Sequence, residues 1–486
     1  MTALRTLGLA LLFASTLTDA AQGPNIILIM ADDLGYEALG CNGGTSYTTP
    51  LLDQLASRGM RFTHCYSQPV CTPSRVKIMT GQSNARNYRQ FGLMPAGQIT
   101  FGNLLKEAGY TTCIAGKWQL SGGAEPTIKG TWWSDCGFDQ SCMWAYSHYL
   151  KPADQAHYKS NSLTGDRTTS RFWNPCILQN GNYRPTTAEE FGPDIYTQFI
   201  LDFIDENQKK PFFVYYPMAL THSPFVPTPH TTHYPPSHKS KSNQKYFGGM
   251  IQYTGYLVDR IVKKLEQVRI AENTLLIFTT DNGTGRGLIS RQGSRLVPGG
   301  KALPIDAGCH VPLIALWPGA IEAGTECHDL IDFSDFLPTL AEASQAKLPN
   351  DRLLDGRSFF PQLKGKRGNP RKEVIVHYDK DPGSITPKFR RVRFAYNGRH
   401  KLYDDGRFYD VPNDWDEENP LAISNLTPAL QKVRNQLNEA FKKLPRWTPD
   451  NSSFGNLADN ETRKRIELRD KILASEAKSK SPQDFD

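Results

Sequence analysis

The chain has 486 residues, of which 39% are hydrophobic and 22% charged, a composition typical of a globular protein with one large domain and a smaller one. Its net charge of +7 favours anionic partners. The basic residues are dispersed and form no nucleic-acid-binding motif, which argues against a nucleic acid as the partner. After the N-terminus, no segment is long and apolar enough to span a bilayer.

The N-terminus predicts a secretory signal peptide over residues 1–20. A positive start is followed by a short apolar run at 7–13, and the small residues Thr18 and Ala20 have the spacing of a cleavage site. The mature protein is therefore expected to be secreted or periplasmic. In such an oxidising compartment we expect some of the nine cysteines to pair, with Cys71 as the candidate for an unpaired one.

Short apolar runs alternate with helical patterns through most of the chain. Runs of this kind are typical of buried strands in a parallel sheet. Residues 50–59 and 101–110 end at or next to a glycine, as helices often do, and residues 250–268 place apolar side chains on one face. The alternation predicts the α/β class, with a large doubly wound mixed sheet flanked by helices. The apolar runs lie at residues 25–30, 111–116, 211–216, 274–280 and 311–317.

The pattern changes after about residue 370. Residues 373–379 and 390–411 predict a short antiparallel sheet, with a hairpin turn at the Asp-Asp-Gly tripeptide, and residues 425–444 predict a helix. The charged tail from about residue 461 is expected to fray. The predicted domains are the signal peptide over residues 1–20, the α/β domain over residues 21–370 and a C-terminal α+β subdomain over residues 371–486.

Polar side chains follow four of the apolar runs, where each predicted strand ends. Ligands of open α/β sheets bind at these carboxyl ends. Each residue alone has a structural explanation, since paired aspartates often cap turns and single histidines are usually structural. Together, three carboxylates and an amide oxygen suit Ca²⁺, or alternatively Mg²⁺, and neighbouring lysines suit a tetrahedral oxyanion. The residues are Asp32 and Asp33 after 25–30, Lys117 after 111–116, His222 shortly after 211–216, and Asp281 and Asn282 after 274–280.

Cys71 opens the stretch Cys-Thr-Pro-Ser-Arg, which predicts the start of a helix because Pro73 fits a first helical turn. Such a turn offers free N–H groups and a positive dipole to an anion. A buried or disulfide-bonded cysteine is the structural alternative. With Arg75 on the same turns and an oxyanion site nearby, a nucleophile is the better interpretation of Cys71.

Residues 71–75 resemble the Cys-x-Pro-x-Arg core of the type I, formylglycine-dependent sulfatases, which are arylsulfatase-like members of the alkaline phosphatase superfamily. Thr80 and Gly81 complete the core, and the resemblance continues over nearly the whole mature chain. Further matching motifs, in the order found in that family, are PNIILIMADDLG (24–35), AGKW (115–118), THSPF (221–225), TTDNG (279–283) and GGK (299–301).

The resemblance implies a sulfuric ester hydrolase whose α/β domain is catalytic. Cys71 would be oxidised by a maturation enzyme to formylglycine, whose hydrate is the nucleophile of a calcium-assisted reaction through a sulfo-enzyme intermediate. Arg75 would hold the hydrate, and His222 would contact the bridging oxygen and protonate the leaving alcohol. Lys117 and Lys301 would bind sulfate oxygens. The implied Ca²⁺ ligands are Asp32, Asp33, Asp281 and Asn282 together with residue 71.

The sequence departs from the family pattern at two places. Many relatives have histidine two positions after the first lysine, where this chain has Gln119. We expect Gln119 to bind substrate by orienting the sulfate or the hydrate, while the alternative is a contact with the polar rim of the sugar. Asp306 and His310 replace residues of a second motif, a change expected to alter packing. His310 is also a candidate to take the proton that Gln119 cannot accept.

The predicted substrate is a sulfated small molecule, and more specifically a sulfated carbohydrate, because export, positive charge and the resemblance all favour one. Two alternatives stay open. A phosphonate monoester or phosphodiester hydrolase of the same superfamily carries a similar core. A non-catalytic relative would bind sulfated glycans without turnover, which Gln119 slightly favours and the intact set of Cys71, Arg75, Lys117 and His222 disfavours.

Overall fold

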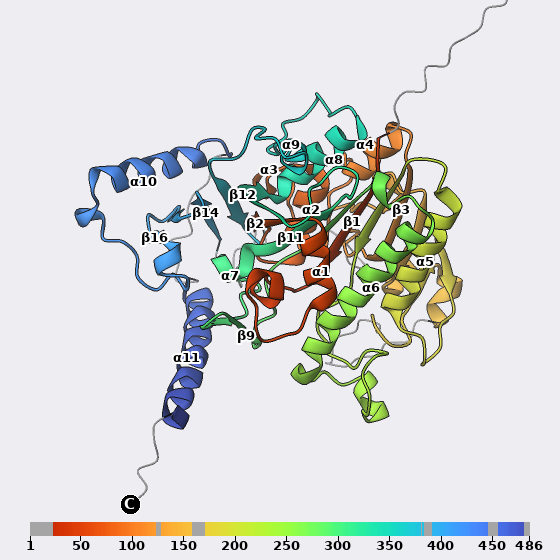
Figure 1. Cartoon of the computed structure of the whole chain (residues 1–486), viewed down its shortest axis with the longest axis horizontal. Coiled ribbons are helices and arrows are strands. Elements are labelled where there is room, and N and C mark those ends of the chain that lie inside the picture. Colours follow the sequence, from red (N-terminus) through yellow and green to blue (C-terminus); the bar gives the residue numbers. More distant parts are fainter. Residues whose placement is uncertain are drawn as a thin grey trace, which may run out of the picture.

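The computed structural model describes residues 23–122, 128–157, 171–380, 382, 391–445 and 455–480. The predicted signal peptide lies outside these residues. No helix in the described part of the chain is long and apolar enough to cross a membrane. A ten-stranded sheet with helices on both faces forms the body of the protein, and a small sheet stands beside it (Figure 1).

The large sheet is mixed, with its parallel part in the middle. β1 (Asn25–Ala31) pairs in parallel with β7 (Phe212–Pro217) on one side and β8 (Thr274–Thr280) on the other. β3 (Thr111–Lys117) extends the parallel part beyond β7, whereas β11 (His310–Leu316) runs antiparallel to β8. This sheet confirms the predicted α/β class. The remaining strands are β2 (Met60–Tyr66) and β12 (Thr325–Asp332) beyond β11, and β4 (Gln140–Trp144), β5 (Ile177–Gln179) and β6 (Asn182–Arg184) beyond β3.

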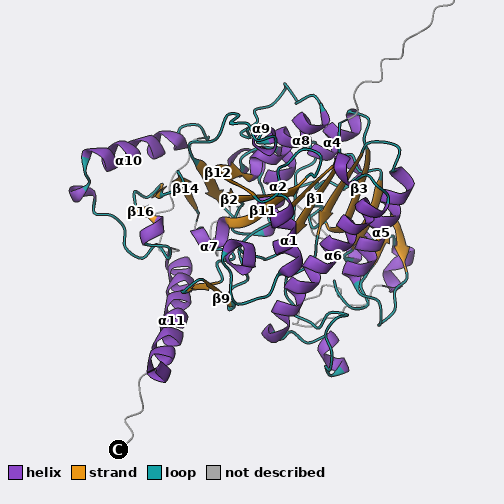
Figure 2. Cartoon of the chain, in the orientation of Figure 1, coloured by secondary structure: helices purple, strands orange, loops and turns teal. Residues whose placement is uncertain are grey.

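Helices cover both faces of the large sheet, which explains why its central strands are apolar throughout (Figure 2). Successive side chains of a strand point to opposite faces. Ile26 and Leu28 of β1 belong to a core cluster with α2, α4 and α8, whereas Ile27 and Ile29 belong to one with α1, α5 and α6. The helices are α1 (Pro50–Arg58), α2 (Cys71–Thr80), α3 (Asn84–Asn87), α4 (Phe101–Glu107), α5 (Gly192–Asn207), α6 (Phe247–Gln267), α7 (Asp306–Cys309), α8 (Phe336–Ser344) and α9 (Phe360–Leu363).

The C-terminal region forms the predicted small antiparallel sheet and helix. One face of the sheet packs on α10 (Pro428–Phe441) through Leu402 and Leu437. The other face shares a core cluster with Val70 and Ala302 of the large domain. These two residues directly precede Cys71 and follow Lys301, so the small sheet supports the segments that carry predicted site residues. Its strands, in order, are β13 (Val374–Tyr378), β14 (Val392–Tyr396), β15 (His400–Tyr403) and β16 (Phe408–Asp410).

The expectation that the tail frays from about residue 461 is wrong, because α11 (Gly455–Lys480) is one continuous helix. It contacts β10 (Arg295–Pro298) of the hairpin that β10 forms with β9 (Ile289–Gln292). Arg465 of α11 is buried, donates to the Pro298 carbonyl (2.8 Å) and pairs with Asp416 (2.7 Å). Among the described side chains of α11, ion pairs attach the helix and an apolar stripe does not.

The expectation of disulfides is also wrong for this structure, which describes all nine cysteines as free thiols. Most of them are buried on separate elements of the large domain. Cys113 and Cys142 lie on neighbouring strands, but Cys113 faces Gln140 and Cys142 faces Ala115 across the ladder. Because the two thiols are offset by two residues, this strand pairing does not place them opposite each other.

Candidate active site

Four strand ends and one helix start deliver the predicted site residues to one edge of the sheet. β1, β3, β7 and β8 run in the same direction, so their carboxyl ends lie together. Cys71 is the first residue of α2, and the helix carries Arg75 one turn later. The side chains that the strand ends contribute are Asp32 and Asp33 after β1, Lys117 at the end of β3, His222 after β7, and Asp281 and Asn282 after β8.

The carboxylates form one buried, hydrogen-bonded group. Asp33 has a φ of 61°, a left-handed conformation that is uncommon for a residue with a side chain. Its N–H donates to Asp281 Oδ1 (3.2 Å), and its Oδ1 accepts the Asn282 amide (2.8 Å). Asp32 lies beside them and is fully buried. Three negative charges are thus held away from water.

Three cationic side chains balance this charge. The Lys117 Nζ lies 2.7 Å from Asp32 Oδ2, and the Lys301 Nζ lies 2.6 Å from Asp33 Oδ2. Arg75 donates to Asp281 Oδ2 (3.0 Å) and to the Lys117 carbonyl (3.2 Å). Buried charges are retained only when they are paired, so each cation fixes a carboxylate in place. Arg75 and Lys117 are each 1% exposed.

Two oxygens of this group have no hydrogen-bond partner although they are buried: Asp32 Oδ1 and Asn282 Oδ1. Buried acceptors are normally satisfied, and exceptions require an explanation. Asp32, Asp33 and His222 also offer potential ligand atoms that all lie within 4.8 Å of one another. Carboxylate and amide oxygens are the ligands of hard divalent cations. The residues present therefore fit Ca²⁺ or Mg²⁺.

The protonation of Asp281 gives the same indication. Burial, reinforced by the neighbouring Asp32 charge, raises the pKa of the Asp281 carboxyl to about 7. Burial alone would also raise the pKa of Asp32, but the charges of Lys117 and Arg75 hold it below its usual range. A divalent cation beside Asp281 would favour the ionised carboxylate.

His222 faces the carboxylates with one ring nitrogen. Its Nδ1 lies 2.6 Å from the Ser223 carbonyl, which makes Nδ1 the protonated nitrogen of the neutral ring. Nε2 lies 3.7 Å from Asp33 Oδ2. Burial and the nearby Lys301 charge lower the pKa of His222 to about 3. The imidazole of the free protein is thus neutral at physiological pH, with an available lone pair on Nε2.

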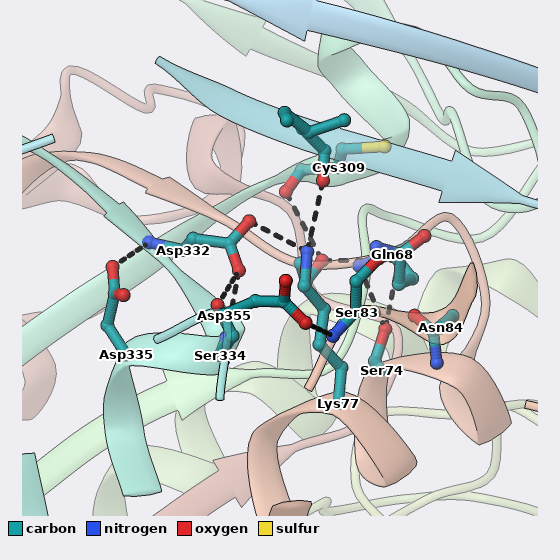
Figure 3. Close-up of polar contacts among 12 residues, drawn as sticks. Gln68, Ser74, Lys77, Ser83, Asn84, Cys309, Asp332, Ser334, Asp335 and Asp355 are labelled. Carbon is teal, nitrogen blue, oxygen red and sulfur yellow. Dashed lines mark hydrogen bonds and ion pairs between the residues drawn. The ribbon is translucent and has the colours of Figure 1, made fainter. Parts of the chain in front are cut away.

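Cys71 is fixed at the helix N-terminus and is only 3% exposed. Ser74 holds the preceding loop, since its hydroxyl donates to the Val70 carbonyl (2.9 Å) and accepts the Gln68 N–H (3.0 Å; Figure 3). The N–H groups of the first helical turn have no partners within the helix. Residue 71 therefore sits where an anion is favoured.

Cys71, His222 and Lys301 open into one cavity of about 270 Å³, and Gln119 lies on its wall. Arg75 and Lys117 do not line the cavity, because they are bonded to the buried carboxylates. Sequence reasoning missed several wall residues, which come from loops without helical or strand periodicity. The missed residues are Phe91, Tyr146, Arg171, Arg286 and Lys380.

Comparison with known proteins agrees with this geometry. The sequence matches the sulfatase family over residues 24–346. The chain belongs to the sulfatase family. Residues 301–446 match the C-terminal region of N-sulphoglucosamine sulphohydrolase. The chain is 34% identical to human arylsulfatase A over 402 residues, which cover 79% of this chain and 75% of that protein.

A second relative of this sulfatase is the canine N-acetylgalactosamine-6-sulfatase, 32% identical over 425 residues that cover 82% of this chain and 74% of that protein. Among solved structures, BT4656 in complex with its substrate D-glucosamine-2-N,6-O-disulfate has a TM-score of 0.67 at 21% identity. The structural match covers 89% of this chain and 100% of the BT4656 chain, which supports the same fold. The chain is a sulfuric ester hydrolase of the alkaline phosphatase superfamily.

The departures from the family pattern have different surroundings in this sulfatase. Gln119 adopts a left-handed φ of 52° and reaches the cavity. His310 instead stacks between Tyr36 and Tyr66, with ring centroids 4.0 and 5.0 Å away, and lies 3.4 Å from Asp306. In this structure His310 therefore has a packing role. His310 is not on the cavity wall, so it does not fit the role of proton acceptor.

Proposed function

We propose that this sulfatase hydrolyses the sulfate esters of a sulfated carbohydrate, with formylglycine made from Cys71 as the nucleophile and Ca²⁺ as the metal. One observation carries the proposal: Cys71 opens into the same cavity as His222 and Lys301, beside a buried carboxylate and a buried amide that each have an unpartnered oxygen. The names of N-acetylgalactosamine-6-sulfatase and of the ligand D-glucosamine-2-N,6-O-disulfate support a carbohydrate substrate.

Residues of the buried group would hold the cation. When bound, Ca²⁺ supplies positive charge that offsets the charge on the sulfate oxygens. As a hydrate, residue 71 offers one hydroxyl to attack sulfur and a second one from which the aldehyde re-forms as sulfate leaves. Arg75 lies on the turn below and would orient that hydrate. The proposed ligands are Asp32, Asp33, Asp281 and Asn282 together with residue 71.

Lysine side chains would bind the sulfate oxygens. Lys301 lines the cavity and uses one of its three N–H donors on Asp33, so two donors remain for sulfate. Lys117 is paired with Asp32. A cation held by Asp32 would leave the ammonium group of Lys117 available to the anion. Preorganised donors of this kind stabilise the charge that develops in the transition state.

His222 would protonate the leaving alcohol through Nε2, which requires the imidazolium. Its pKa is depressed in the free protein, and a sulfate group bound in the cavity adds the negative charge that raises it. The rate kcat is therefore expected to fall as pH rises past the pKa of His222 in the complex. His222→Ala should lower kcat by about 10²–10⁴-fold on a sugar sulfate. The loss should be smaller on 4-nitrophenyl sulfate, whose leaving group needs no proton.

A panel of defined sulfated saccharides, assayed for free sulfate against the Cys71→Ala variant, tests the proposal. Release by the wild type alone is the expected result. A phosphonate monoester and a phosphodiester belong in the same panel, because faster turnover of either would favour the alternative hydrolase. Binding of sulfated glycans without any release of sulfate would favour the non-catalytic alternative.

We also propose that residues 1–20 direct export to the periplasm or the medium, and that a formylglycine-generating enzyme modifies Cys71 in the producing cell. N-terminal sequencing of the exported protein is expected to begin shortly after residue 20. An exported protein that retains Met1 would contradict the predicted cleavage.

A further inference from the structure

The wall of the active cavity is basic. Arg171, Arg286, Lys301 and Lys380 line it together with His222, and no described carboxylate does. The scissile sulfate monoester carries a single negative charge, which the metal site and Lys301 already oppose. The positive charge of this wall is therefore suited to bind a second anionic group.

Arg171 is a cation of this wall for which the described residues provide no counter-charge. Lys301 is paired with Asp33, and Arg286 is paired with Glu461 of α11 (2.9 Å). The Arg171 guanidinium lies over the Trp144 ring, 4.5 Å from its centroid, and forms no ion pair with a described residue. Its Nη1 is buried without a hydrogen-bond partner, and the residue as a whole is 9% exposed.

The position of Arg171 is fixed before any ligand binds. The ring of Trp144 supports the guanidinium from one side. The next residue, Phe172, is 1% exposed in the core, and its carbonyl accepts the Gly192 N–H (2.7 Å). A planar guanidinium held in this way is arranged to donate two parallel N–H bonds to two oxygens of a carboxylate or a sulfate group. Little side-chain freedom remains to be lost on binding.

The direction of the second group follows from the proposed reaction. Arg171 and His222 line the same cavity, whereas the buried carboxylates do not. Because His222 is the group assigned to the bridging oxygen, we place Arg171 on the side of the leaving alcohol. An anion bound there belongs to the carbohydrate and not to the sulfate being removed.

We propose that Arg171 is a specificity residue that binds a second anionic group, a carboxylate or a further sulfate, on the sugar that carries the scissile sulfate. The substrate class is then an acidic saccharide with at least two negative charges. This inference rests on the proposed function and deepens it.

Arg295 is a matched control, because its guanidinium also lies over a tryptophan ring and has an unpartnered nitrogen, but it does not line the active cavity. Its guanidinium lies 4.5 Å from the Trp415 centroid, and its Nε is buried without a partner. The cavity beside it measures about 30 Å³ and is lined by the carboxylates Glu37 and Asp306. Such a space holds about one water. Arg295→Gln therefore removes an equivalent cation–π contact without touching the active cavity.

The test compares three forms of one sulfated saccharide that differ only at a neighbouring group: carboxylate, sulfate or hydroxyl. For the wild type, kcat/KM is expected to be higher on one or both of the charged forms, and the preferred form identifies the anion. Arg171→Gln should reduce that preference by about 10–100-fold, as expected for a hydrogen bond to a charged group. Arg171→Lys, which keeps the charge but not the planar fork, should recover only part of it. Arg295→Gln should leave the preference unchanged.

Two results would overturn the inference while leaving the proposed function intact. One is a wild type that releases sulfate from all three forms with equal kcat/KM. The other is an Arg171→Gln variant that loses the same factor on every form, since that pattern indicates a structural role. A wild type that releases sulfate from no form and from no aryl sulfate would instead reject the proposed function, and this inference with it.

Discussion

Two cavities of about 270 Å³ lie along α2, and both are lined by charged residues. Cys71 lines the first of them, the active cavity. Lys77, on the same helix, lines the second, at the junction with the small C-terminal sheet. Volume and charge alone therefore do not tell which cavity binds a substrate.

The two cavities differ in whether their buried polar atoms are satisfied. Around Lys77, Asp332 accepts from the lysine (2.7 Å) and from Ser334 (2.6 Å), and Asp355 accepts the Ser83 N–H (2.7 Å; Figure 3). Asp335 is paired with Arg371. None of these carboxylate oxygens is unpartnered, whereas Asp32 and Asn282 in the active site each leave one buried oxygen unbonded. Buried acceptors without a hydrogen-bond partner therefore distinguish the active site from the cavity beside Lys77.

The largest expected difference between the two cavities is in activity. Cys71→Ala should abolish sulfate release without changing the free energy of unfolding by more than the loss of one small side chain. In active wild-type protein, mass spectrometry of the peptide containing residue 71 should show an aldehyde in place of the thiol. Full activity with Cys71 entirely in a disulfide would reject the mechanism.

Metal binding should separate the two acidic groups next. Asp281→Ala is expected to lose the cation, and with it both the activity and the rise in Tm that Ca²⁺ produces. Asp332→Asn should keep that Ca²⁺-dependent rise, because its carboxylate lies in the satisfied network. Elemental analysis of active wild type should find Ca²⁺ or Mg²⁺. Stoichiometric zinc would contradict the oxygen-ligand assignment.

Stability should show the reverse order. Lys77→Met leaves Asp332 buried without its cation and should cost about 3–5 kcal/mol in the free energy of unfolding. Lys106→Met is the matched control, because its pair with Asp139 is 52% and 32% exposed and should be worth at most about 1 kcal/mol. Urea titrations of both variants measure the difference. Equal losses would mean that the network around Lys77 does not carry buried charge.

The raised pKa of Asp281 predicts how metal affinity depends on pH. Because the folded pKa is about 7 and the usual value is near 4, the metal-free protein loses stability as pH rises from about 4 to 7. Ca²⁺ requires the ionised carboxylate, so its apparent affinity should fall about tenfold per pH unit below 7. Calorimetric titration at several pH values checks this. A constant affinity between pH 5 and 7 would contradict a protonated Asp281.

Gln119 should have the smallest effect and sharpens the picture of the active cavity. Gln119→Ala is expected to slow the release of sulfate from residue 71 more than its transfer to residue 71, which single-turnover kinetics can resolve. A mutant with raised KM and unchanged kcat would show that Gln119 contributes only uniform binding. In that case its role would be confined to the rim of the sugar.

The sequence was sufficient to locate the polar residues that follow strands. Asp32, Lys117 and Asp281 come directly after or at the end of apolar runs, and parallel strands bring their carboxyl ends together by topology alone. Arg171 could not be found in this way. It comes from a loop without periodicity, and its meaning depends on contacts with Trp144 and on a missing partner, which only three-dimensional packing defines.

The C-terminus was mispredicted for a related reason. The tail from about residue 461 was expected to fray because it is charged, and helices usually attach through an apolar stripe. α11 attaches instead through Arg465 and Arg469, which converge on Asp416 from a different part of the chain. The sequence of residues 455–480 contains no pattern that identifies Asp416 as the partner. Long-range ion pairs are invisible to patterns of hydrophobicity.

The burial of residue 71 limits when its proposed oxidation can take place. Val70 packs in one core cluster with Val376 and Phe394 of the small sheet, and Cys71 is 3% exposed in the finished fold. Under the proposed mechanism, a separate enzyme would have to reach the thiol before these layers close. At about 5–20 residues per second, synthesis takes roughly 15–60 s to travel from residue 71 to β13. The proposed conversion of Cys71 would thus be confined to the period of synthesis and folding.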